Sequence, residues 1–186
     1  MSRWLPDTKQ RLRSAALDLI AEQGFAATTV PQITARAGLT TGTFFRHYAD
    51  KREVLFATNG FAERATEMIV EARPSLRPVD VIREGLREVA ETAFEGRQRE
   101  VRAIGDIIRS DEGLRERDLH KRAALAEAIR AGFLQREVDP IVAALLAQTS
   151  VTVLYIAIDE WLDHDDGESL ADLVELVLLT LRQEVV

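Results

Sequence analysis

The sequence predicts an all-α protein in which a small three-helix head precedes a larger helical body. No segment longer than a few residues alternates apolar and polar side chains with period two, whereas apolar residues recur throughout with helical spacing. Only 10 Gly and 5 Pro occur among 186 residues, which is typical of a helical protein. We expect about nine helices, with the head at residues 1–50 and the body at residues 51–186.

The first 50 residues contain start and stop signals for three short helices. A helical stripe of apolar residues defines the first helix: Leu12, Ala15, Ala16, Leu19 and Ile20. Gly24 is placed to end it. Thr29 and Gln32 form a capping box that begins the second helix, which we expect to end at Gly38. Thr40 is the expected N-cap of a third helix that runs to about Tyr48.

The body begins with a capping pair, Asp50 and Glu53, and a helical pattern that continues to Ala72. The pattern predicts one long fourth helix, although the Asn59-Gly60 pair inside it is a turn signal and marks a weak point. Further helices are expected at residues 78–95, 98–110, 114–136, 140–163 and 169–185.

Composition favours a folded protein of the cytoplasm. Hydrophobic residues make up 46% of the chain and cysteine is absent, which excludes disulfides and thiolate chemistry. The first residues have no apolar run, so we expect no signal peptide. The longest apolar stretch, Ile141 to Ile158, contains several polar residues, which is typical of a buried helix and not of a membrane span.

The net charge of −7 is unevenly distributed. Residues 1–60 carry eight basic and five acidic side chains, a net of +3, and the remainder carries a net of −10. Because salt screens charges over roughly 10 Å, local charge governs the attraction to phosphate. The basic head is therefore compatible with nucleic acid despite the acidic total.

Two short helices joined by a tight glycine-containing turn predict a helix-turn-helix, whose second helix enters the DNA major groove. Thr41, Gly42 and Arg46 would face the base edges, while Thr29 would bind a phosphate at a helix N-terminus. The alternative for Thr41 and Arg46 is a solvated helix face, and for His47 it is an interaction with the helix C-terminus. The predicted DNA-contact residues are Thr29, Thr40, Thr41, Gly42, Thr43, Arg46, His47 and Lys51.

This region resembles the TetR family of bacterial repressors from about Thr8 to Leu55. The resemblance rests on Gly24-Phe25, Thr28-Thr29-Val30, Ala37-Gly38-Leu39, the run Thr43 to Tyr48, and Lys51. Two positions depart from the family pattern, because their aromatic residues are exchanged. The family usually has Tyr at the position of Phe45, with its hydroxyl on a phosphate, and Phe at that of Tyr48. The swap implies that Phe45 cannot make this phosphate contact.

The resemblance implies a homodimeric one-component repressor that a small molecule releases from a palindromic DNA operator. The run Asp118 to Phe133, Asp139-Pro140 and Trp161-Leu162 is also similar to the mycofactocin-type, acyl-CoA-responsive regulators of this family. An activator or a global regulator of the same fold is an alternative. From another class, the chain could be a helical-bundle enzyme or a protein-interaction module with a vestigial DNA-binding head.

A polar stripe on the helix expected at residues 140–163 is a candidate ligand site: Gln148, Thr152, Tyr155 and Asp159. Buried polar groups need partners, which either a ligand pocket or a dimer interface would supply. In the pocket interpretation, the ligand is largely hydrophobic with one polar end. Its apolar wall would contain Met68, Leu86, Val89, Leu125, Ile129 and Phe133.

The last helix is apolar on almost every side, so it must be buried on more than one face. A second subunit would supply the additional cover. The expected dimer contacts are Leu170, Val174, Val177, Leu178 and Leu181.

The sequence favours neither a metal site nor an enzyme. Asp163-His164-Asp165-Asp166 with Glu168 contains metal-ligand residue types, but consecutive residues rarely converge on one ion. No phosphate-binding loop, dinucleotide-binding glycine motif or nucleophile elbow is present in the sequence, and its three histidines are scattered. We expect no cofactor. The effector, the operator sequence and the sign of regulation are not determined by the sequence.

Overall fold

A computed structural model of the chain describes residues 7–56, 60–163 and 167–184, and the described part is helical without strands. The chain divides into two compact units, residues 1–59 and residues 60–186. The division falls after the predicted boundary at residue 50, because Val54 is buried in the core of the N-terminal unit. The all-α prediction is confirmed.

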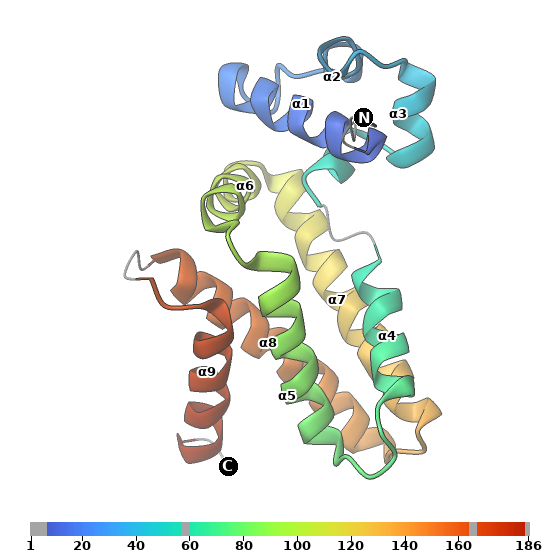
Figure 1. Cartoon of the computed structure of the whole chain (residues 1–186), viewed down its shortest axis with the longest axis vertical. Coiled ribbons are helices and arrows are strands. Elements are labelled where there is room, and N and C mark those ends of the chain that lie inside the picture. The colour runs from blue at the N-terminus through green and yellow to red at the C-terminus, as the bar shows by residue number, and fades with distance from the viewer. Residues whose placement is uncertain (1–6, 57–59, 164–166, 185–186) are drawn as a thin grey trace, which may run out of the picture. The chain divides into compact units, whose positions relative to one another are not determined.

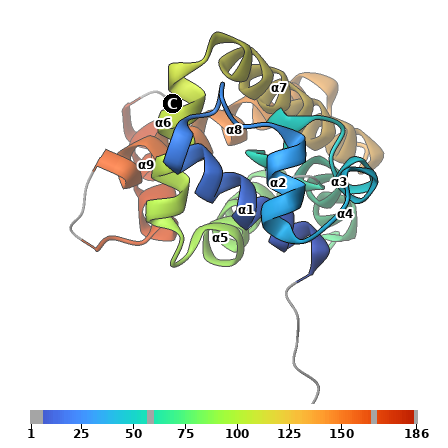
Figure 2. The same cartoon turned by 90° about the horizontal axis from the view of Figure 1, so that it is seen from above.

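The N-terminal unit contains α1 (Thr8–Gln23), α2 (Val30–Ala37), α3 (Thr41–His47) and a short 3-10 helix, η1 (Lys51–Val54). Figures 1 and 2 show these elements gathered around one small core. The core consists of apolar side chains from all four elements: Leu12, Ala15, Ala16, Leu19, Ile33, Ala37, Phe44, Tyr48 and Val54. The predicted stripe on the first helix is therefore the face that packs against α2 and α3.

The turn between α2 and α3 has the predicted chemistry. Thr29 and Gln32 form the capping box at the start of α2. Gly38 adopts a left-handed conformation with φ 64°, and the Leu39 amide donates to the Thr34 carbonyl at 2.8 Å. The Thr40 hydroxyl accepts from the Thr43 amide at 3.2 Å and begins α3.

The prediction of one long fourth helix from residue 53 to residue 72 is wrong. The Asp50 carboxylate caps only η1, accepting from the amides of Arg52 at 2.8 Å and Glu53 at 3.2 Å. Helix α4 begins separately at Phe61 and ends at Glu71. Gly60 precedes it with φ 100°, a conformation outside the right-handed helix. The Asn-Gly turn signal therefore prevails over the helical pattern, although Asn59 itself lies outside the described residues.

The C-terminal unit contains α4, α5 (Pro78–Val89), a π-helical turn η2 (Ala90–Phe94), α6 (Gln98–Ser110), α7 (Glu112–Gln135), α8 (Pro140–Asp163) and α9 (Leu170–Glu184). Helix α8 packs against α5, α6, α7 and α9. In Figure 1, α4 lies along α7, while α5 and α9 cover other sides of α8. The predicted 78–95 helix differs in its last turn, where the backbone widens into η2.

Helix α8 is long and apolar enough by composition to cross a membrane, and it is the only such helix in the described residues. Its surroundings account for this character, because many of its side chains lie in the main core of the C-terminal unit. Those buried most deeply include Ala143, Ala147, Ser150, Val153 and Ala157. Small residues at these positions allow the neighbouring helices to approach α8 closely.

Helices α4 and α7 contact each other at backbone distance. A Cβ atom added to Gly132 would lie 3.1 Å from the Ile69 Cβ and 3.4 Å from the Thr66 Cα. The Thr66 hydroxyl donates to the Ala128 carbonyl at 3.0 Å. At the end of this contact, the Arg136 guanidinium donates to the Ile69 carbonyl at 3.1 Å and satisfies part of the C-terminus of α4. A side chain at position 132 would force Ile69 to shift by a few tenths of an ångström.

The end of α7 contains the only described non-glycine residue with positive φ, Glu137 at 58°. The Val138 amide donates to the Phe133 carbonyl at 3.1 Å, and the Glu137 amide donates to Leu134 at 3.0 Å. This is the Schellman arrangement, in which the position of Glu137 usually holds glycine.

We predict that Glu137→Gly stabilises the protein by about 0.5–1 kcal/mol, because the left-handed strain of a side chain exceeds the added entropy of glycine in the unfolded chain. Glu137→Ala is the matched control and keeps the strain, so its free energy of unfolding stays within about 0.5 kcal/mol of the wild type. Urea denaturation measures both variants. A glycine variant no more stable than the alanine variant contradicts the assigned strain.

Candidate nucleic-acid interface and ligand pockets

The outer face of α3 is exposed and consists of Thr41, Gly42, Phe45 and Arg46. These positions follow helical spacing, so their side chains share one side of the helix. Arg46 makes no ion pair within the described part of the chain. Phe45 is 55% exposed, although large aromatic side chains are usually buried. The face offers a cation, a hydroxyl and an aromatic ring to an external partner.

Gly42 has room for a side chain within the protein. An added Cβ would have only the Thr40 hydroxyl oxygen nearby, at 3.9 Å. Gly85 on α5 is different, because a Cβ there would lie 2.8 Å from the Met68 Cε. A side chain at Gly85 would therefore displace the end of Met68, whereas a side chain at Gly42 would displace nothing. A small residue at the start of an exposed recognition helix suits the close approach of another molecule.

The predicted threonine contacts have structural roles as well. The Thr29 hydroxyl accepts from the Gln32 amide at 3.4 Å and donates to the Gln32 side-chain oxygen at 2.9 Å. The hydroxyls of Thr40 and Thr43 lie 2.9 Å apart and form a hydrogen bond with each other. These three side chains begin helices, so any phosphate contact would extend an existing capping network.

Lys51 fixes the loop that precedes α2. Its ammonium donates to the carbonyls of Phe25 and Thr28, each at 2.7 Å, and lies 4.2 Å from the centre of the Phe25 ring. The sequence predicted a DNA contact for Lys51, but not its hydrogen bonds to carbonyls within the protein. His47, at the other end of the turn, is half-buried. Phosphate binding by these two residues remains a prediction.

The exchanged aromatic residues have clear places. Phe44 is fully buried, and Tyr48 is 2% exposed with its hydroxyl donating to the Lys9 carbonyl at 3.2 Å. Burial raises the pKa of the Tyr48 hydroxyl, which therefore stays protonated as a donor. Both rings therefore belong to the core of the N-terminal unit. The tyrosine oxygen ties α3 to α1, while Phe45 presents only carbon to the exterior.

A residue that the sequence analysis missed holds the turn between α2 and α3. The Arg11 guanidinium of α1 donates to the Ala37 carbonyl at 2.6 Å. Such a bond satisfies an orphan carbonyl at a helix C-terminus. Arg11 and Ala37 lie 26 residues apart in the sequence, so the pair gives no local signal, and only the packing of α1 against α2 brings them together.

The polar stripe on α8 lies on the surface. Gln148, Thr152 and Asp159 are exposed and Tyr155 is half-buried. All four line a shallow pocket of about 390 Å³ between α7 and α8, together with Arg122, Ala123, Val151 and Ile156. The structure brings the stripe together as predicted, but on the outside of the helical body. Thr152 already donates its hydroxyl to the Gln148 carbonyl at 2.9 Å.

Tyr155 is covered by an arginine from α7. The Arg122 guanidinium carbon lies 3.5 Å from the centre of the Tyr155 ring, and the Asp118 carboxylate binds Arg122 at 2.6 Å. Burial, and secondarily the charge of Asp118, raises the pKa of Tyr155 to about 12. The hydroxyl is thus a neutral donor at physiological pH. This stacked group gives the α7–α8 pocket one rigid wall.

The predicted apolar wall does not belong to this pocket, and that part of the ligand-site prediction is corrected. Its six residues lie in or beside the main core, where they pack with neighbouring helices: Met68, Leu86, Val89, Leu125, Ile129 and Phe133. None of them lines the pocket that the polar stripe forms. The sequence prediction combined the polar stripe of α8 with residues of α4, α5 and α7 in one cavity. Spacing along the sequence does not reveal which side of α8 faces those helices.

Two of the five predicted dimer contacts on α9, Leu170 and Val174, need correction, while the other three stay predictions. Leu170 and Val174 are buried within the single chain at 3% and 0% exposure. Val177, Leu178 and Leu181 are partly buried against the same core. The apolar residues that α9 leaves exposed are Leu176 and Leu179, because Leu173 and Val174 already face inward. Helix α8 similarly exposes Ile141, Val142, Leu145 and Ile156.

The candidate metal cluster is only partly described. His164, Asp165 and Asp166 lie outside the described residues. Within the described ranges, no group of three or more His, Asp or Glu side chains is arranged to hold a metal ion.

Solved structures share this fold. A putative fatty acid metabolism regulator from Clostridium perfringens matches with a TM-score of 0.60 and 18% identity, over 95% of this chain and 98% of that one. FadR of Thermus thermophilus, a TetR-family repressor solved with lauroyl-CoA, matches with a TM-score of 0.53 and 23% identity, over 96% and 95% of the two chains. These similarities show that the chain shares its helical fold with both structures.

Sequence comparison identifies the N-terminal unit more closely. Residues 12–58 match the family described as "Bacterial regulatory proteins, tetR family". The regulator TcmR of Streptomyces glaucescens is 37% identical over 73 residues, which cover 39% of this chain and 32% of TcmR. The chain therefore aligns with about a third of that relative. The N-terminal unit is therefore similar to the matched region of TetR-family regulators.

We predict that Gly42→Ala lowers DNA affinity by about fivefold to 150-fold without lowering the melting temperature. The added methyl group has free space inside the protein, whereas a crowded protein–DNA contact costs about 1–3 kcal/mol. Circular dichroism gives the melting temperature, and fluorescence anisotropy gives the affinity for a duplex from the region upstream of the gene. Unchanged affinity would show that DNA does not approach this part of α3.

Proposed function

We propose that the chain is a homodimeric one-component transcriptional repressor of the cytoplasm, which a small effector releases from a palindromic operator. The observation that carries the proposal is the exposed face of α3, with an unpaired Arg46 and a Gly42 that the fold itself does not require. It belongs to a domain whose relatives are DNA-binding regulators. Two such helices in one dimer would read major grooves about 34–36 Å apart.

The base-reading role of Arg46 has a direct test. We predict that Arg46→Ala costs roughly 1–3 kcal/mol of binding to the operator and little binding to a scrambled duplex, because an arginine on base edges carries sequence information. Fluorescence anisotropy at fixed salt measures both affinities. Arg64→Ala, an exposed arginine of α4, is the matched control and leaves both affinities unchanged. An equal loss on both duplexes assigns Arg46 to a phosphate instead.

The proposed dimer uses α8 and α9. Support comes from the exposed apolar residues on these two adjacent helices, since single chains rarely leave several large apolar side chains in water on neighbouring elements. The polar stripe lies on the same α8 helix as Leu145 and Ile156. In this arrangement, Gln148 and Thr152 would supply the hydrogen bonds of the interface among its apolar contacts.

The dimer makes a further prediction. Leu145→Glu with Leu176→Glu places charges at positions that are 63% and 55% exposed, so the single chain keeps its fold while the dimer would bury both charges. We expect the dimer dissociation constant to rise at least about 100-fold, because an unpaired buried charge costs several kcal/mol. Val79→Glu on α5 is the control. Light scattering that finds the double variant still dimeric contradicts this interface.

For the effector, we propose a largely hydrophobic molecule with one polar end, of the acyl-CoA class. Two similar structures support this class: one is a putative fatty acid metabolism regulator, and the other was solved with lauroyl-CoA. In this proposal the apolar part of the effector would lie in the core between α4, α5, α7 and α8, which would have to open around Met68 and Leu86. Release of operator DNA by lauroyl-CoA, but not by CoA alone, tests the class.

A further inference from the structure

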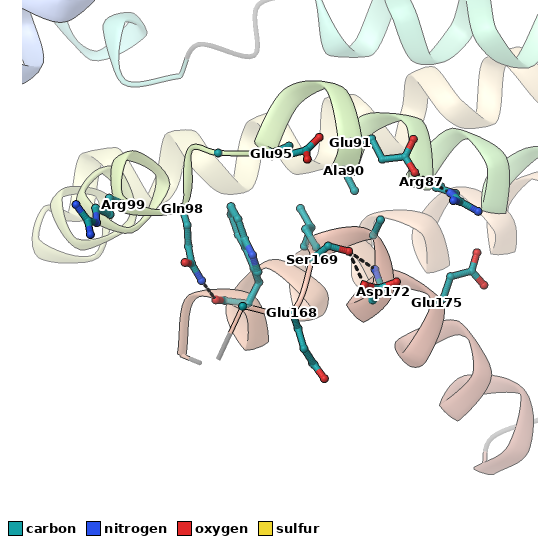
Figure 3. A pocket seen from close by; sticks show the side chains of 15 residues that line it. Arg87, Ala90, Glu91, Glu95, Gln98, Arg99, Glu168, Ser169, Asp172 and Glu175 are labelled. Atoms are coloured by element: carbon teal, nitrogen blue, oxygen red, sulfur yellow. Dashed lines mark hydrogen bonds and ion pairs between the residues drawn. The ribbon is translucent and has the colours of Figure 1, made fainter. Parts of the chain in front are cut away.

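A second and larger pocket lies in the C-terminal unit, away from the polar stripe on α8. Its volume is about 860 Å³, within the range of small-molecule sites. Its walls come from the end of α5 and η2, the start of α6, Trp161 of α8, and the first turns of α9. Figure 3 shows Glu91 and Glu95 on the α5–η2 side, and Ser169, Asp172 and Glu175 on the α9 side. We call it the α5–α9 pocket.

Trp161 provides the first argument that the α5–α9 pocket has an occupant. Its side chain is only 6% exposed and forms part of the wall. The centres of the Trp161 and Phe94 rings lie 6.4 Å apart, and the rings meet edge to face. The Gln98 side chain donates a hydrogen bond to the Trp161 backbone carbonyl. The position of Trp161 is therefore fixed from two sides. Its indole N–H has no acceptor among the described residues, and its nitrogen is not among the fully buried unpaired atoms, so water in the pocket can reach it. A hydrogen-bond acceptor inside the pocket would satisfy it.

Charge provides the second argument. Five carboxylates line the pocket against two guanidinium groups, those of Arg87 and Arg99. Two of the five carboxylates are already paired, because Arg87 binds Glu91 at 2.8 Å and Arg83 binds Glu175 at 2.8 Å. Glu95 and Glu168 have no ion pair in the described part of the chain. The pocket therefore attracts cations and repels anions such as free fatty acids or CoA thioesters.

The backbone provides a third observation. The π-helical turn η2 begins at Ala90, and both Ala90 and Glu91 line the pocket. Such turns are rare and often occur at functional sites, because one widened turn redirects the side chains that follow it. The apolar surface of the pocket comes from Ala90, Trp161, Leu170 and Ala171. A ligand could therefore place its hydrocarbon part on these residues and its charge among the carboxylates.

We propose that the α5–α9 pocket binds a small organic cation that carries a hydrogen-bond acceptor. The acceptor of the ligand accepts a hydrogen bond from the indole N–H of Trp161. The positive charge of the ligand lies among the carboxylates around Glu95, and its carbon skeleton covers Ala90 and Leu170. This site is distinct from the proposed acyl-CoA effector site, and its binding does not depend on the DNA-binding function.

Intrinsic fluorescence tests the site directly, because the chain has only two tryptophans, Trp4 and Trp161. In a Trp4→Phe variant, all tryptophan emission comes from Trp161. Butyrylcholine combines a cation, an ester acceptor and a short alkyl group, and 3,3-dimethylbutyl butyrate is its uncharged isostere. We expect butyrylcholine to change the emission saturably with a Kd on the order of 1 mM or below. The isostere binds at least about tenfold more weakly, because it lacks the charge that the carboxylates attract.

Variants then separate the two recognition elements by calorimetry. Trp161→Phe keeps the ring but removes the N–H, and weakens butyrylcholine binding about three- to tenfold. Glu95→Gln with Glu168→Gln weakens it at least about threefold. Glu116→Gln, an exposed carboxylate of α7, is the control and has no effect. Circular dichroism verifies that each variant is folded.

Several outcomes would overturn the proposal. They are equal binding of the cation and its isostere, preference for butyrate over both, absence of a saturable response of Trp161, or full affinity in Trp161→Phe. None of these measurements contains DNA. A failure here is therefore distinguishable from a failure of the proposed repressor function.

Discussion

The packing of α3 against α1 is the contact on which the candidate DNA-binding surface depends. Phe44 and Tyr48 bury their rings among the apolar side chains of α1, and each such ring contributes about 1.5–3 kcal/mol. The Tyr48 hydroxyl adds a hydrogen bond to the Lys9 carbonyl. With one side of α3 held in this way, Phe45 and Arg46 have only the exterior to face. The direction of the recognition helix is thus a consequence of its core residues.

The charged residues near this surface act first within the protein. Arg11 satisfies a carbonyl at the end of α2, and Lys51 holds two carbonyls of the loop before it. Arg36 makes a bidentate ion pair with Glu22, which raises the pKa of the arginine and lowers that of the glutamate. The positive charge of the head is therefore organised by internal contacts, and Arg46 is the exposed arginine of α3 that such contacts leave available.

In the C-terminal unit, α4 and α7 are joined so closely that they constitute one structural element. Gly132 admits the side chain of Ile69, Thr66 bonds to the backbone of α7, and Arg136 bonds to the end of α4. A displacement of α4 therefore requires α7 to move with it or these contacts to break. Helix α7 also carries Arg122, which lies beside the polar stripe. An effector or a dimer contact at the stripe that moved α7 would therefore also move α4.

The sequence by itself determined the helical class, the helix-turn-helix and most helix boundaries, because caps, glycines and apolar spacing are local signals. Tertiary structure decided which side of each apolar helix faces its neighbours. Val174 and Leu176 are equally apolar, yet only packing against α5 and α8 buries the first and exposes the second. The polar stripe on α8 was likewise visible in sequence, but its outward direction depends on contacts with distant residues, which spacing along one helix does not encode.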